Sequence, residues 1–143
     1  AIECSAARLA SARRSKSDLA ALARQIKRMG ELATPRPEVD ESQAMATVSQ
    51  FMAVDSEFHL GIARAARNGY FLAAIEEARA AMFLPIGAMF RRLEDNANAY
   101  HEAIFAALEA GDADAAEAAM AAHLRASRGD IEGLVQRAVP ARR

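Results

Sequence analysis

The sequence has few of the features that mark exported or membrane proteins. Its single cysteine, Cys4, excludes an intrachain disulfide and fits a reducing compartment. The longest uncharged apolar run, "AAMFLPIGAMF" at 80–90, contains a proline and is too short to cross a bilayer. The opening stretch, "AIECSAARLASARRS", has an early acid and lacks the apolar core of a signal peptide. These absences predict a cytoplasmic protein without membrane association.

An excess of charge of either sign is also lacking. With 18 basic and 19 acidic residues, the formal net charge is −1, which excludes a general attraction to nucleic acid or anionic lipid. A length of 143 residues suits one domain with a sizeable core. We therefore expect residues 1–143 to form a single domain.

The third absence is that of strand signals, because no run of β-branched residues is present. The chain is instead rich in Ala, Leu, Met, Glu and Arg, which favour helices. We expect an all-α fold, an antiparallel bundle of about six helices that encloses a metal or ligand cavity. The expected helices cover about 15–30, 42–67, 70–92, 94–110 and 112–136, after a first helix at about 2–13.

Local signals refine some of these bounds. Ser15 followed by Asp18 is typical of a capping box at the start of the second helix, and Gly30 is a typical stop at its end. Pro85 lies inside the fourth helix and is expected to kink it.

The third expected helix carries an acid and a histidine on its apolar side. Asp55 and His59 are four residues apart, so their side chains lie one turn apart on the same face. A buried, unpaired carboxylate costs roughly several kcal/mol, so Asp55 needs a partner. The apolar stripe around the pair consists of Phe51, Val54, Phe58, Ile62 and Ala66.

The other two histidines lie on the inner faces of the last two helices. Between these helices, Gly111 closes one and Asp112 caps the next. His101 precedes this turn by about as many residues as His123 follows it, roughly 15–17 Å at 1.5 Å per residue. We therefore expect the two imidazoles to face each other at one level of a helical hairpin.

Together these observations predict a metal site built from Asp55, His59, His101 and His123. One carboxylate and three imidazoles suit a divalent transition metal, with zinc as the first choice and nickel or manganese as alternatives. A different interpretation stays open, since an inward histidine is often a core residue bonded to a backbone carbonyl.

Two segments resemble the ligand-binding domain of GntR-type transcriptional regulators of the FCD class. They are "VDSEFHLGIARAARN" at 54–68 and "HEAIFAALEAGDADAAEAAMAAHL" at 101–124, and "IECSAARLASARRSKSDLAAL" at 2–22 resembles the first two helices of that domain. The residues that match the family pattern are Asp55, His59, Asn68, His101, Gly111, Asp112, Met120, His123 and Leu124.

This resemblance implies an all-α bundle that binds a metal, usually with a small organic acid on it, and that forms a homodimer. Members of the family read DNA through an N-terminal winged helix-turn-helix. That part is missing from this chain, as is the arginine that the family often has just before this opening. DNA contact is therefore expected only through such an additional domain, and the chain is either a fragment or a stand-alone sensor.

A carboxylate effector needs a cationic receptor, for which an arginine is well suited. Arg79 lies where the family often has an arginine that faces the cavity, although a solvated surface position is the alternative. Asn68 and Tyr100 are further candidates for effector binding, with a packing role as the alternative for Tyr100. Arg91 and Arg92 are weaker candidates.

Two rival functions use the same metal. A hydrolase would need a general base, but Glu57 and Glu102 point away from the apolar stripes, and "HEAIF" has Phe105 where a zinc protease needs its second histidine. A purely structural metal in a closed four-ligand site is the other possibility. We expect no enzyme, and interpret the chain as a metal-dependent, effector-binding domain of a GntR-type transcription regulator.

Overall fold

The computed structural model describes residues 1–34, 40–89 and 98–138. In these ranges the chain forms six helices and no strand, which confirms the predicted all-α bundle. The helices are α1 (Ile2–Arg13), α2 (Lys16–Ala33), α3 (Glu41–Ala65), α4 (Gly69–Met89), α5 (Ala99–Ala110) and α6 (Ala113–Ala138).

The start of α2 agrees with the sequence, but its end does not. Ser15 and Asp18 form the predicted capping box, in which each side chain accepts a hydrogen bond from the backbone N–H of the other residue. The predicted stop at Gly30 is wrong, because α2 continues to Ala33 and Thr34 donates its backbone N–H to the carbonyl of Gly30. The extra turn buries Leu32 in the core, which favours helix beyond the glycine.

The junction between α3 and α4 also differs in detail from the prediction. The helix α3 begins one residue earlier than expected, with Asp40 as its N-cap, and Arg67 adopts the left-handed conformation at φ 51°. Asn68, which follows the last residue of the predicted helix, does not share this conformation. Its side-chain oxygen instead accepts from the backbone N–H groups of Tyr70 and Phe71, and so caps α4.

The other predicted helix bounds lie only partly within the described residues. Gly111 ends α5 in the left-handed conformation at φ 75°, and the side chain of Asp112 accepts from the backbone N–H of Ala115, as predicted. Pro85 lies within α4, and the kink expected there stays a prediction. The expected end of α4 at 92 and start of α5 at 94 lie outside the described residues.

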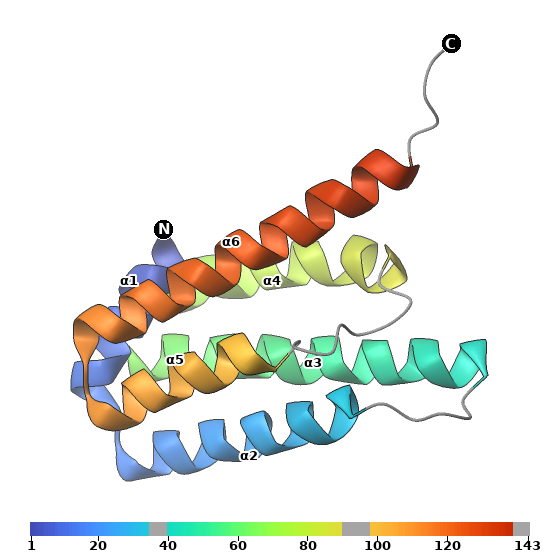
Figure 1. The fold of residues 1–143 in the computed structure, drawn as a ribbon. Helices are drawn as coiled ribbons and strands as arrows, with labels where there is room; N and C mark the ends of the chain where they lie inside the picture. Colours follow the sequence, from blue (N-terminus) through green and yellow to red (C-terminus); the bar gives the residue numbers. More distant parts are fainter. Residues whose placement is uncertain (35–39, 90–97, 139–143) are drawn as a thin grey trace.

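The helix α1 contacts four others, namely α3, α4, α5 and α6 (Figure 1). It can approach them closely because Ala6, Ala7 and Ala10 form its buried face. Large apolar side chains fill the rest of the core, and those with almost no exposure are Leu22, Met29, Phe58, Ile62, Ile104, Leu108 and Met120. Within the described ranges, no helix is both long and apolar enough to cross a membrane.

Candidate metal centre

The pair on α3 faces inward, as the sequence predicted. Asp55 and His59 are 7% and 1% exposed, and the apolar side chains of Phe58 and Ile62 beside them are also buried. The helical period places the two polar groups one turn apart within this stripe. The apolar face of α3 is thus interrupted by an acid and an imidazole in the middle of the core.

The α5–α6 hairpin brings the other two histidines together. The ring centroids of His101 and His123 lie 4.4 Å apart, which confirms that they face each other at one level. Both are buried, at 1% and 7% exposure. The tight turn at Gly111 sets this register, because His101 lies ten residues before Gly111 and His123 eleven after Asp112, so the two reach nearly the same depth.

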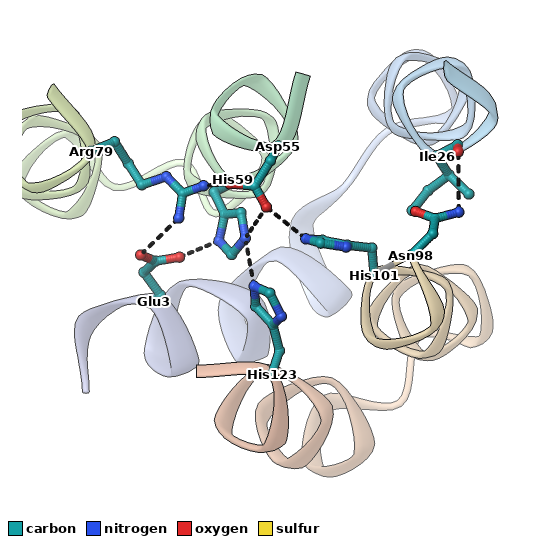
Figure 2. A network of polar contacts seen from close by, with 8 residues as sticks. All are labelled: Glu3, Ile26, Asp55, His59, Arg79, Asn98, His101 and His123. Carbon is teal, nitrogen blue, oxygen red and sulfur yellow. Dashed lines mark hydrogen bonds and ion pairs between the residues drawn. The ribbon is translucent and has the colours of Figure 1, made fainter. Parts of the chain in front are cut away.

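The two pairs meet at one point in the bundle (Figure 2). Asp55 Oδ1 lies 2.8 Å from His101 Nε2 and 3.7 Å from His59 Nε2. His59 Nε2 lies 3.2 Å from His123 Nε2. One carboxylate oxygen and three imidazole nitrogens therefore all lie within 4.8 Å of one another.

This arrangement fits a transition metal in both spacing and chemistry. Two ligands that bind a metal at 2.0–2.1 Å are about 3.3 Å apart in a tetrahedral site. Three of the six separations, 2.8, 3.2 and 3.7 Å, scatter around that value, and all six are within 4.8 Å. The donor set combines three neutral nitrogens with one anionic oxygen, which suits zinc, nickel or manganese. The buried group of Asp55, His59, His101 and His123 could therefore hold a metal ion.

A fifth residue, Glu3, lies beside this group and was missed in the sequence. Its Oε2 contacts His59 Nδ1, the ring nitrogen that faces away from the other three residues. Glu57 and Glu102, the two acids considered above as a general base, are therefore not the only acids near the candidate ligands. A signal was available, because Glu3 shares the helical spacing of Ala6, Ala7 and Ala10, the buried face of α1.

Arg79 of α4 lies beside the carboxylates of both Asp55 and Glu3. Its Nη2 pairs with Asp55 Oδ2, and its Nη1 lies 4.0 Å from Glu3 Oε1. At 8% exposure it faces inward, so the alternative of a solvated surface arginine is wrong. Its predicted role in effector binding stays a prediction.

Burial and neighbouring charges determine the protonation states of His123 and Glu3. Burial, and then the nearby charges of His101, His59 and Arg79, lower the pKa of His123 to about 2. Burial alone would raise the pKa of Glu3, but the hydrogen bond and charge of His59, with Arg79, outweigh it and lower that pKa to about 2. At neutral pH, His123 is therefore a neutral potential ligand and Glu3 is a carboxylate.

The other predicted residues lie farther out. Tyr100 is 37% exposed, with its ring centroid 6.1 Å from that of His123, so it lies at the edge of the centre. The side chain of Asn68 caps α4. Glu57 pairs with Arg64 on the surface, and Glu102 is exposed, as the sequence predicted. Arg91 and Arg92 lie outside the described residues.

Comparison with known proteins adds one finding. The family model of the FCD domain matches residues 1–126, a range that includes the four potential ligands, Glu3 and Arg79. No curated protein matches the chain significantly.

Proposed function

Because the chain belongs to the FCD domain family, the effector-binding C-terminal domain of GntR-family regulators, we propose that it is a metal-dependent sensor of small carboxylates. The observation that carries the proposal is the convergence of Asp55, His59, His101 and His123 on one point. These residues would hold a divalent ion, zinc before nickel or manganese. When bound, such an ion would supply positive charge and, with a coordination number above four, a position for an oxygen ligand.

The charges around the centre support an anionic effector. The carboxylates of Glu3 and Asp55 and the guanidinium of Arg79 together carry one negative charge. A divalent ion among neutral imidazoles would change this to one positive charge. A single carboxylate group would then neutralise a site that is otherwise buried, where an uncompensated charge is costly.

Two further residues are suited to contact this effector. Arg79 combines burial with the bidentate geometry that matches a carboxylate, and it already lies beside both acids of the centre. Tyr100 carries a hydroxyl group at the exposed edge next to His123. A direct contact from Asn68 has less support, because its side-chain oxygen already accepts two backbone N–H groups.

The same geometry suggests how binding would be transmitted. The four residues come from α3, α5 and α6, so one ion would join three helices. An effector that prefers one packing of these helices would shift the population toward it. We propose that this shift changes the geometry of a homodimer and, in a regulator with a DNA-binding domain, the placement of that domain.

A purely structural metal is the second candidate, favoured by the burial of all four residues. Calorimetry distinguishes the two. Zinc-loaded protein is titrated with acetate, lactate, malate and citrate, and the chelated protein serves as the control. Binding of any of these acids to the loaded protein alone supports the sensor, whereas tight zinc binding without acid binding favours the structural role. Hydrolysis of generic esters by the loaded protein would instead favour the rival hydrolase.

A further inference from the structure

Glu3 is not one of the four converging residues, yet it contacts one of them directly. Its carboxylate comes from the first turn of α1, and its side chain is only 15% exposed. The contact with His59 joins α1 to α3, two helices that pack against each other. Neither Glu57 nor Glu102, the acids nearest to the ligands in sequence, makes a comparable contact, because both are exposed.

The chemistry of this contact determines which nitrogen of His59 carries a hydrogen. An ionised carboxylate only accepts hydrogen bonds, so His59 Nδ1 must be the donor. In the neutral ring the lone pair is then on Nε2, the atom that lies 3.2 Å from His123 Nε2. A ring with the opposite tautomer would turn an N–H, instead of a lone pair, toward the other three residues.

The position of Glu3 is itself held from the opposite side. Its second oxygen, Oε1, lies 4.0 Å from Nη1 of the buried Arg79. The carboxylate thus lies between an imidazole and a guanidinium, which restrains its rotation (Figure 2). Carboxylates that orient a metal-binding histidine in this way also raise its basicity.

We infer that Glu3 is a positioning residue, which fixes the tautomer and orientation of His59 so that Nε2 can bind the metal. The inference rests on the proposed function, since it requires that the four residues hold an ion. It adds α1 to the three helices that the ion would join. Glu3 itself would not touch the metal or the effector.

The test compares zinc affinity among variants, measured by competition with a chromophoric chelator. Loss of a residue that hydrogen-bonds a metal ligand without touching the metal typically weakens metal binding about 10–100-fold. We expect a decrease of this size in zinc affinity for Glu3→Ala. Glu3→Gln should lie between Glu3→Ala and the parent, because its amide oxygen can still accept from Nδ1. The matched control is Glu117→Gln, an exposed acid of α6 that pairs with Arg8 of α1 and should bind zinc like the parent.

A second readout reports on His59 itself. In the zinc-loaded parent, the ¹⁵N shifts of the imidazole nitrogens should show a protonated Nδ1, and Glu3→Ala should alter them while Glu117→Gln should not. Far-UV circular dichroism of the chelated proteins checks that each variant is folded. If Glu3→Ala does not fold, Glu3→Gln decides the result with the same two readouts.

The outcomes separate this inference from the proposed function. Zinc binding by the parent with no more than about a twofold change in the folded Glu3 variants would overturn the role of Glu3 and leave the metal site intact. A parent that binds none of zinc, nickel and manganese would overturn both. Weaker binding with altered His59 shifts, limited to the Glu3 variants, supports the inference.

Discussion

The molecule has two kinds of charged network, and they differ mainly in burial. In the centre, Arg79 pairs with Asp55, and both side chains are about 90% buried. At the surface, Arg8 of α1 pairs with Asp114 and Glu117 of α6, whose side chains are 87% and 43% exposed. The residue types are the same, but only the central network is withdrawn from water.

This difference determines what each network can do. Exposed ion pairs contribute little to stability, because water already solvates both partners. A buried group must be compensated by its neighbours, and its charge acts strongly on whatever enters the site. Convergence and burial, more than residue type, therefore distinguish a candidate site from a solvated surface, and three experiments test this distinction.

The largest effect is expected for Asp55→Ala. It removes the one anionic member of the four potential ligands, so zinc affinity should fall by at least about 100-fold, beyond the usual loss for an outer-shell partner. In the chelated protein it also leaves Arg79 without its nearer carboxylate, which should cost about 3–5 kcal/mol in the free energy of unfolding. Calorimetric zinc titration and urea unfolding measure the two effects.

The control for this experiment is Arg8→Gln, which breaks the exposed network instead. We expect unchanged zinc affinity and a melting temperature within about 1–2 °C of the parent. A result in which Arg8→Gln destabilises as much as Asp55→Ala would contradict the proposed importance of burial.

An intermediate effect is expected for removal of the metal. Binding to the native state alone stabilises it by about 2.7 kcal/mol at a metal concentration of 100 times Kd. For a chain of this size, the melting temperature with zinc should exceed that with a chelator by roughly 5–10 °C. Differential scanning calorimetry measures the shift, and Asp55→Ala should show almost none. Equal shifts in both proteins would mean that zinc binds elsewhere.

The smallest effect concerns Asp18, in the partly exposed capping box of α2. Burial raises its pKa, but the hydrogen bonds from Ser15 and the charge of Arg67 outweigh this, so the pKa of Asp18 lies below its usual value. Its charge therefore stabilises the fold above about pH 4, and this contribution is lost as pH falls through the lowered pKa. Asp18→Asn should cost about 0.5–1 kcal/mol at pH 7 and less at pH 3, measured by urea unfolding. A cost that does not change with pH would contradict the role of the charge.

Much of the fold and the four central residues could be predicted from the sequence. Helical periodicity identified the inner faces of α3, α5 and α6, and the glycine turn fixed the relative depth of His101 and His123. These are local signals, since each depends on the repeat of one helix or the length of one hairpin. The same signals misjudged Gly30, because they do not report that a further turn would bury Leu32.

The partners of the central residues could not be predicted in the same way. The pairing of Arg79 with Asp55 and Glu3 joins α4 to α3 and α1 through residues at least 24 positions apart, so no pattern within one helix contains it. This pairing changes the expected effect of removing Asp55 on the stability of the metal-free protein. An uncompensated Asp55 would make its removal from the metal-free protein neutral or stabilising, whereas the pairing with Arg79 makes that removal destabilising.

The packing of α1 against α6 has a consequence for how the protein is made. The α1 segment, which includes Glu3, is translated before α6, the helix that packs against α1 and carries His123, 120 residues later. At 5–20 residues per second, this interval lasts roughly 6–24 s. Until α6 has been translated, α1 lacks the helix that packs against it. The ribosome-bound chain also lacks His123, so the centre is incomplete. A chaperone or a metal ion that meets the nascent chain would encounter the pair on α3 well before the site can close.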